Sequence, residues 1–190
     1  MQNITVYNVQ DVISILAGDT PEERKNFIKR FSDNPLVYNK DEDEYSQSLE
    51  TEFITRLADK LIMVHTNKIK PKTAFDASWN QYKGDVGIPK YNIWFDLKNA
   101  AFDEGSKLRG DYPTYFTGCI KKDSLKTFGR VNNFYIGFNK PCTKITVIDA
   151  DKLLKYVVES GYKYQKVDNV DLVIMNDIPR GEIWDFINIE

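Results

Sequence analysis

The sequence predicts a mixed α/β fold, in which a mixed central β-sheet is flanked by helices. Apolar residues recur at helical spacing in the N-terminal third, with Leu49, Phe53, Leu57 and Leu61 as the best example. Short apolar runs of strand length, such as Asn92–Leu97, follow in the middle of the chain. Two more such runs precede one further helix, and the C-terminal part is again rich in strand patterns.

The composition is that of an ordinary globular protein. The 190 residues predict one domain with a sizeable core, and the formal charge of −2 gives no general attraction to polyanions. No window is long and apolar enough to cross a bilayer, and the N-terminus lacks the pattern of a signal peptide. We therefore expect a cytoplasmic protein with no membrane segment.

The sequence also argues against several chemistries. Cys119 and Cys142 have no CxxC spacing, and with the single histidine, His65, they do not make a conventional zinc site. We interpret the cysteines as free thiols in a reducing compartment and His65 as structural. GxSxG, P-loop and dinucleotide-binding motifs are absent, so neither a serine nucleophile nor the use of ATP or NAD is indicated.

The N-terminal elements are an extended segment and two helices. Ile4–Val9 is expected to be extended, and Val12–Ala17 forms a short helix. The second helix has Asp19 or Thr20 as its cap and Pro21 in its first turn, where proline is well tolerated.

A third helix is predicted to begin at Ser48, after an acidic run, Asp41–Glu44, that is expected to be a solvated loop. At about 100° per residue, Glu50 falls within the apolar stripe of this helix and Glu52 on the opposite face. Two interpretations of Glu50 remain open. It either stays in water in the first turn, where it favours the helix N-terminus, or points toward a metal pocket.

The stretch that carries the chemistry follows. Asp85 lies in or at the end of a strand, Ile88–Lys90 forms a turn, and Asn92–Leu97 forms the next strand. Alternation along that strand places Asp96 and Lys98 on one face, and a hairpin would bring Asp85 beside Asp96. Two adjacent carboxylates need a cation or a proton, and Mg²⁺ suits one or two carboxylates with water as its remaining ligands.

The remaining elements complete the sheet. The segment Asn99–Lys126 is expected to be loop-rich, with basic residues interleaved with aromatic ones, which suits contact with nucleic acid. The residues predicted to contact DNA are Lys83, Lys107, Arg109, Lys121 and Lys122. Two strands are expected next, at Asn133–Phe138 and Lys144–Ile148. A helix over Lys152–Glu159 follows, capped by Asp149 or Asp151, and two final strands are expected at Asp171–Met175 and Ile183–Ile189.

These motifs resemble the PD-(D/E)xK nucleases, which include restriction endonucleases, Holliday-junction resolvases and phage endonucleases. Asp85 matches the first acidic position of the family, with Gly84 in the place of the proline, and Asp96 and Lys98 match the second acidic position and the lysine. The glutamate of the preceding family helix matches Glu50, followed at the same spacing by Phe53, Ile54 and Leu57. The resemblance implies a restriction-endonuclease-like core over about 48–160, with a helical extension over 1–47 and a β-rich tail over 161–190.

The resemblance also implies an activity: an endonuclease that uses Mg²⁺, with Mn²⁺ as a substitute, to hydrolyse DNA to a 5′-phosphate and a 3′-hydroxyl. Asp85, Asp96, the main-chain carbonyl of Leu97 and Glu50 would hold the metal, and Lys98 would orient the attacking water and stabilise the phosphorane. A homodimer is expected by analogy with enzymes that cut both strands. The type of nuclease, and the choice between DNA and RNA, stay open.

A function of another class competes with this one. Asp96 and Lys98 are a short and common motif, and in a non-catalytic binding or interaction protein they would form only an ion pair at the end of a strand.

Overall fold

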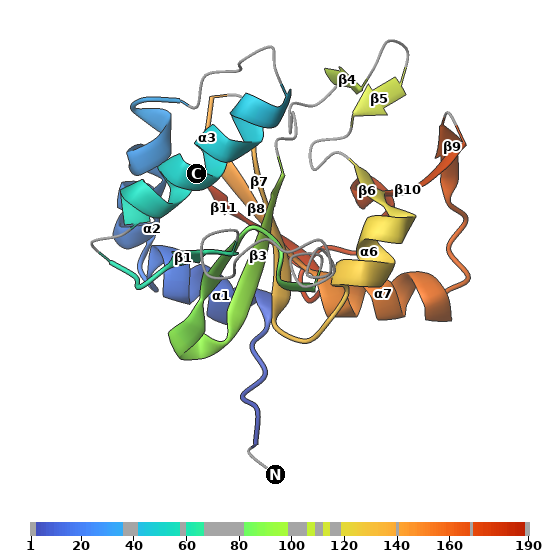
Figure 1. The fold of residues 1–190 in the computed structure, drawn as a ribbon, viewed down its shortest axis with the longest axis horizontal. Coiled ribbons are helices and arrows are strands. Elements are labelled where there is room, and N and C mark those ends of the chain that lie inside the picture. Colours follow the sequence, from blue (N-terminus) through green and yellow to red (C-terminus); the bar gives the residue numbers. More distant parts are fainter. Residues whose placement is uncertain are drawn as a thin grey trace.

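The computed structural model of the 190-residue chain describes residues 3–35, 42–57, 60–66, 82–98, 106–108, 112–114, 119–139, 141–167 and 169–188. Within these residues the chain forms a mixed six-stranded sheet with helices on both faces, which confirms the predicted mixed α/β class (Figure 1). The sheet order is β1 (Val64–His65), β2 (Val86–Ile88), β3 (Ile93–Lys98), β7 (Asn133–Phe138), β8 (Lys144–Asp149) and β11 (Trp184–Asn188). Neighbouring strands are antiparallel, except that β3 and β7 are parallel.

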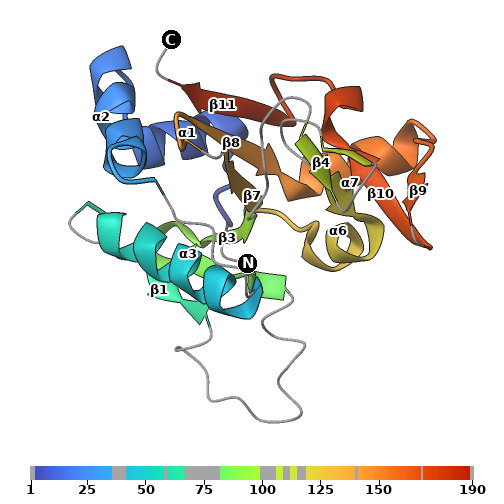
Figure 2. The same ribbon diagram turned by 90° about the horizontal axis from the view of Figure 1, so that it is seen from above.

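Two helical layers cover the two faces of this sheet (Figure 2). One layer consists of α1 (Val9–Ala17), α2 (Pro21–Ser32) and α3 (Glu42–Leu57), and the other of α6 (Lys122–Phe128) and α7 (Ala150–Glu159). Successive strand side chains point to opposite faces, so Phe134 packs with the first layer and its neighbour Tyr135 with the second. Each face therefore buries its own apolar cluster.

Helix caps set the start of the N-terminal helices. The side chain of Asn8 accepts a hydrogen bond from the Asp11 N–H at 2.9 Å, so α1 begins at Val9, three residues before the predicted start. The predicted second helix is confirmed, with Thr20 rather than Asp19 as its cap and Pro21 in its first turn. The side chain of Glu23 in turn accepts a hydrogen bond from the Thr20 N–H, which completes a capping box.

The third helix differs from its prediction at both ends. α3 begins at Glu42, so the expectation of a solvated loop is wrong for 42–44, and Glu50 lies in the middle of the helix rather than in its first turn. Acidic residues are favourable in the first turn of a helix because they complement its dipole, and so an acidic run fits a helix start as well as a loop. The helix ends at Leu57, although the apolar pattern continues to Ile62, which is exposed.

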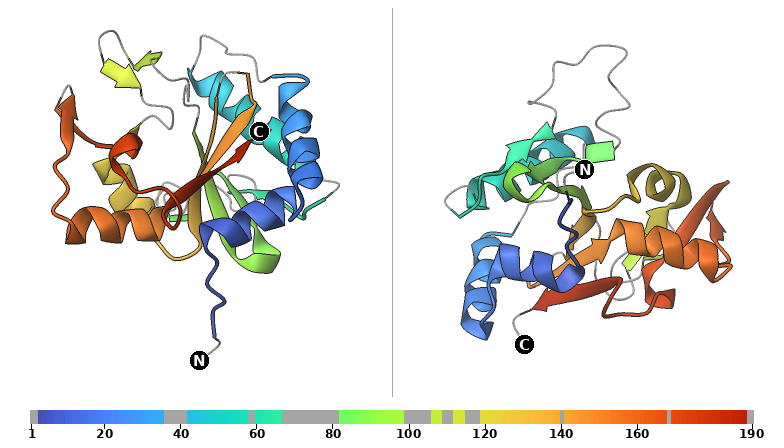
Figure 3. Two further views of the ribbon diagram at one scale, coloured as in Figure 1. Left: turned by 180° about the vertical axis from the view of Figure 1, so that it is seen from behind. Right: turned by 90° about the horizontal axis from the view of Figure 1, so that it is seen from below.

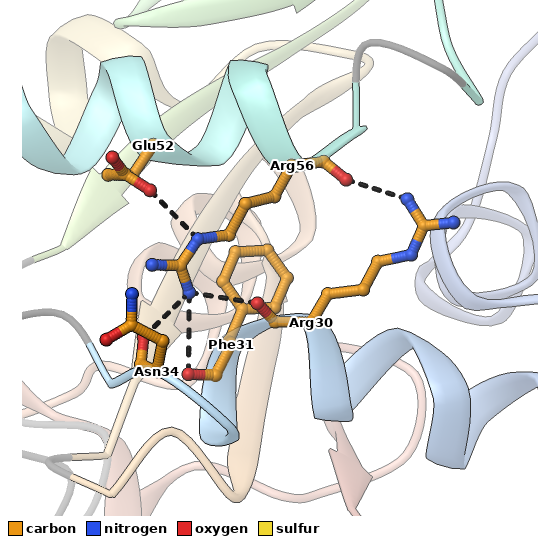
Figure 4. Close-up of polar contacts among 5 residues, drawn as sticks. All are labelled: Arg30, Phe31, Asn34, Glu52 and Arg56. Atoms are coloured by element: carbon orange, nitrogen blue, oxygen red, sulfur yellow. Dashed lines mark hydrogen bonds and ion pairs between the residues drawn. The ribbon is translucent and has the colours of Figure 1, made fainter.

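Two arginines hold α2 and α3 together at their C-terminal ends (Figure 4). The Arg30 Nη1 donates to the carbonyl of Arg56 at 2.7 Å, and the Arg56 Nη1 donates to the carbonyls of Arg30 at 2.9 Å and Asn34 at 3.0 Å. Arg56 is itself held by Glu52, at 2.9 Å from Nε. Because the last carbonyls of a helix lack partners within it, each arginine satisfies a group that the other helix leaves open.

The region before α6 contains more regular structure than the predicted loop. Its described residues form the strand pair β4 (Ser106–Leu108) and β5 (Tyr112–Thr114), then β6 (Cys119–Lys121) and α6. β6 belongs to a second sheet with β10 (Val170–Ile174) and β9 (Gln165–Val167). Three-residue strands carry too few alternating positions for a sequence pattern to indicate them.

The predicted C-terminal half is confirmed in its main elements, β7, β8 and a helix, and of the two candidate caps it is Asp149 that begins α7. The last strand, β11, pairs with β8 at the edge of the main sheet and lies against α1 and α2 (Figure 3). The N-terminal extension and the C-terminal tail thus share the core of the sheet. Within the described residues, no helix is both long enough and apolar enough to cross a membrane.

Candidate functional site

The candidate site begins at a bend just before β2. Gly84 has φ of +68°, and a Cβ at this position would lie 2.4 Å from the carbonyl oxygen of Phe95. Only glycine fits this backbone without strain. The next N–H, of Asp85, donates to the same Phe95 oxygen at 2.7 Å, and Val86 pairs with Phe95. The bend therefore places Asp85 directly before the first residue of β2, beside the C-terminal half of β3.

The Asp85 carboxylate extends the hydrogen bonding of the hairpin beyond the first residue of β2. Its Oδ2 accepts a hydrogen bond from the Leu97 N–H at 2.8 Å. The N–H and the carbonyl of one strand residue point to the same side of the strand, so the Leu97 carbonyl also points toward the side on which Asp85 lies. This arrangement agrees with the ligand role that the family resemblance implies for that carbonyl.

Asp96 and Lys98 share a face of β3, as the alternation predicts. The Lys98 Nζ lies 2.9 Å from Asp96 Oδ1 and 5.2 Å from the ring centroid of Tyr135 on the adjacent strand β7. The side chains are only partly buried, with exposed fractions of 32% for Lys98 and 19% for Asp96. The pair is thus accessible from solvent at the C-terminal end of the strand.

Glu50 reaches the same region from α3. Its side chain is buried and contacts the Nε2 of His65, which follows Val64 in β1. Glu52, by contrast, bonds to Arg56 on the outer side of the helix. The predicted difference between the two glutamates is confirmed, and the interpretation in which Glu50 stays in water is wrong, because its side chain lies on the buried face of the helix.

Asp85 feels the charges of two other carboxylates, those of Asp96 and Glu50. Burial raises the pKa of the Asp85 carboxyl from 3.8 to about 8, and the negative charges of Asp96 and Glu50 contribute to the rise. The Leu97 N–H and the Lys98 ammonium act in the opposite direction. Glu50, Asp96 and Lys98 therefore each lie near enough to Asp85 for their charges to act on its carboxyl.

The donor types of this cluster fit a hard divalent cation, because Mg²⁺ takes carboxylate and carbonyl oxygens as ligands. A positive ion would also relieve the repulsion that raises the pKa of Asp85. Across the described parts of the chain, however, no three His, Cys, Asp or Glu side chains already form a group that could hold a metal ion. Asp85 is bonded to Leu97, Asp96 to Lys98 and Glu50 to His65, so binding an ion requires some of these contacts to rearrange.

Two residues next to the site were not predicted. Thr66, fully buried, donates its hydroxyl to the carbonyls of Gly84 at 2.6 Å and Asp85 at 3.1 Å, and its N–H donates to the Asp85 carbonyl at 3.0 Å. His65 pairs with Val86 across the sheet and contacts Glu50. β1 has two residues, which is too short for a periodic pattern, so neither role could be predicted beyond the uniqueness of the histidine.

The residues predicted to contact DNA are dispersed. Lys83 precedes the bend, and its Nζ lies 4.4 Å from the ring centroid of Trp94, where burial lowers its pKa. Lys121 is exposed in β6, and Lys122 pairs with Asp171 of β10 at 2.9 Å.

The other two residues of this set cannot be placed as side chains. Lys107 lies in β4 with its side chain outside the described structure, and Arg109 lies outside the described residues. Of the predicted contacts that are described, Lys83 is the one adjacent in sequence to the bend that carries Asp85, but its ammonium lies at Trp94.

Comparison of the chain with protein-family models, with curated proteins and with solved structures finds no match in any of the three. The interpretation of the site consequently depends on its own geometry, three carboxylates and a lysine gathered at the end of a β-hairpin.

Proposed function

We propose that this chain is a Mg²⁺-dependent deoxyribonuclease of the PD-(D/E)xK kind, built on a restriction-endonuclease-like core. The observation that supports the proposal is that Asp96, Glu50 and Lys98 all act electrostatically on the buried carboxyl of Asp85, and that Lys98 lies at Asp96. Short motifs of this composition occur by chance, so the proposal is supported less by the motif than by the proximity of a residue of α3 and residues of the hairpin to one carboxyl. The positions of the residues on a hairpin and on the helix before it agree with the resemblance.

The roles follow from the chemistry of the side chains. Asp85, Asp96, Glu50 and the Leu97 carbonyl would hold Mg²⁺, which when bound acidifies a water molecule and polarises the phosphate. Lys98 lies at Asp96, where its ammonium is placed to orient the water and to stabilise negative charge on the phosphorane. The water oxygen forms a bond to phosphorus, the bond to the 3′-oxygen breaks, and that oxygen takes a proton. The products are a 5′-phosphate and a 3′-hydroxyl.

The test is cleavage of plasmid, branched and single-stranded DNA with Mg²⁺ or Mn²⁺, with single-stranded RNA alongside. We expect cleavage by the unchanged protein, and we expect Asp96→Asn and Lys98→Ala each to lower its rate at least about 100-fold, as loss of a central electrostatic group does. A matched control is the pair Asp151 and Lys155, in contact at 2.6 Å on α7. Asp151→Asn and Lys155→Ala should cleave at the unchanged rate.

A second candidate function is favoured by one specific contact. The Lys98 ammonium bonds directly to Asp96, at 2.9 Å from Oδ1 and 3.1 Å from Oδ2, which is also the geometry of a plain ion pair at the end of a strand. In a non-catalytic binding protein this pair would contribute about 0–1 kcal/mol to stability and have no other role. If the unchanged protein binds DNA but cleaves none of the substrates with either metal, this second function is the correct one.

A further inference from the structure

One short strand, β1, contacts both Glu50 and the bend that carries Asp85. β1 pairs with β2 in the register Val64 with Gly87 and His65 with Val86, so its end lies beside the bend that carries Asp85. His65 contacts Glu50 of α3, and the next residue, Thr66, bonds to the backbone of the bend. Two adjacent residues therefore connect a helix and a hairpin that are distant in the sequence.

The contact between His65 and Glu50 fixes a side chain that would otherwise be costly to bury. The exposed fractions of the two side chains are 10% and 9%. A carboxylate removed from water needs a hydrogen-bond donor, and a glutamate loses considerable rotamer freedom when it is ordered. The imidazole supplies a donor on a rigid ring, so it selects one orientation of the Glu50 carboxylate, as partners of metal-binding carboxylates commonly do.

Thr66 performs the equivalent task for Asp85 through the backbone. Its hydroxyl donates to the carbonyls of Gly84 and Asp85, and its N–H donates to the carbonyl of Asp85. These bonds hold the bend in which Gly84 has its positive φ. The direction of the Asp85 carboxylate depends on that bend, because the side chain leaves the backbone at its end.

We propose that His65 and Thr66 are the positioning residues of the metal site, His65 by fixing the carboxylate of Glu50 and Thr66 by fixing the backbone of Asp85. This inference rests on the proposed nuclease function and extends it to two residues outside the metal-binding set. It assigns to the single histidine of the chain a role in which it contacts neither the substrate nor the metal.

The experiment measures Mn²⁺ binding by electron paramagnetic resonance and DNA cleavage for two matched pairs of variants. His65→Phe keeps a ring without a donor, whereas His65→Gln keeps a donor close to the position of Nε2. Thr66→Val removes the hydroxyl, whereas Thr66→Ser keeps it. We expect the first member of each pair to lose about 10–100-fold in Mn²⁺ affinity and in kcat with little change in KM for DNA. The second member should recover most of the loss.

A double-mutant cycle tests whether His65 acts through Glu50. In a Glu50→Gln background, His65→Phe should cause no further loss of Mn²⁺ affinity, because the group that it positions is already gone. Additive losses would overturn the inference, as would Mn²⁺ binding and cleavage by His65→Phe and Thr66→Val at unchanged levels.

These outcomes differ from failure of the proposed function itself. If the unchanged protein binds no Mn²⁺ and cleaves no DNA, the nuclease proposal fails and the inference fails with it. If the unchanged protein does both and the variants do the same, the nuclease proposal stands and only the positioning roles are refuted. Because affinity is measured on the folded protein, loss of thermal stability alone does not imitate the expected result.

Discussion

In the described part of the chain, burial raises the pKa of Asp85 and of Asp149, but the surroundings of the two carboxyl groups differ. Asp85 lies at a bend among other carboxylates, and burial, Asp96 and Glu50 all raise its pKa. Asp149 caps α7, where its Oδ1 accepts a hydrogen bond from the Lys152 N–H at 3.0 Å. A helix N-terminus favours a negative charge, yet burial still raises the pKa of Asp149, from 3.8 to about 6. Only the first of the two aspartates lies in a cluster that a cation would stabilise.

Asp149 gives a prediction about pH. Its pKa in the folded chain is higher than its ordinary value, because burial outweighs the opposing effects of the Lys152 N–H and the Lys152 charge. The folded state therefore binds the proton more strongly than the unfolded state does. This contribution to stability is complete below about pH 4 and is lost as the pH rises through about 6.

Asp149→Asn keeps the cap and removes the titration, since asparagine is as good a cap as aspartate. When the pH rises from 4 to 7, the free energy of unfolding of the variant should rise by about 1–3 kcal/mol relative to that of the unchanged protein. Urea denaturation at the two pH values measures the difference. A difference between the two proteins that is the same at both pH values would contradict the prediction.

At the scale of the elements, the orientation of α3 decides where Glu50 lies. The two arginines at the ends of α2 and α3 supply much of the polar contact between these helices (Figure 4). The apolar contact comes from Phe53 of α3, whose ring centroid lies 5.9 Å from that of Phe31 of α2. Several carbonyls at the helix ends accept hydrogen bonds from one guanidinium group. An arginine is needed there because the ammonium of a lysine is a single compact charge without the planar set of donors.

Arg56→Lys should therefore destabilise the protein although it keeps the charge. The variant leaves the carbonyls of Arg30 and Asn34 without their guanidinium donor, so we expect a loss of about 1–3 kcal/mol in the free energy of unfolding by urea denaturation. Lys25→Ala on the exposed side of α2 is the control and should change stability by less than about 0.5 kcal/mol. Equal stability of the two variants would show that the arginine contacts are dispensable.

At the scale of the whole molecule, the sequence predicted features that depend on a repeating pattern. Strand alternation placed Asp96 and Lys98 on one face, and helical periodicity distinguished Glu50 from Glu52. The predicted start of α3 at Ser48 was wrong, because acidic residues suit both a loop and a helix N-terminus. The contacts of His65 and Thr66 could not be predicted from the sequence, because they join segments that come together only when the sheet forms.

The competition between Lys98 and a cation for Asp96 gives a prediction about the stability of the whole fold. If the site binds Mg²⁺, the folded state is stabilised by about 1.4–2.7 kcal/mol at ten to one hundred times the dissociation constant, which raises Tm. Lys98→Met removes the ammonium that lies 2.9 Å from Asp96. The variant should therefore show a Mg²⁺-dependent rise in Tm at least as large as that of the unchanged protein, while cleaving no DNA.

Asp96→Asn should lose the Mg²⁺ response, and Asp151→Asn, which alters an exposed ion pair on α7, should keep it. Addition of EDTA should reverse every rise in Tm. A plain ion pair predicts no response to Mg²⁺, because Lys98→Met would then leave Asp96 with neither a lysine nor a metal. Its Tm would be lower than that of the unchanged protein by the same amount with and without Mg²⁺. The presence or absence of a Mg²⁺-dependent rise in the Tm of one variant thus separates a metal-dependent nuclease from a binding protein with an ion pair at the end of a strand.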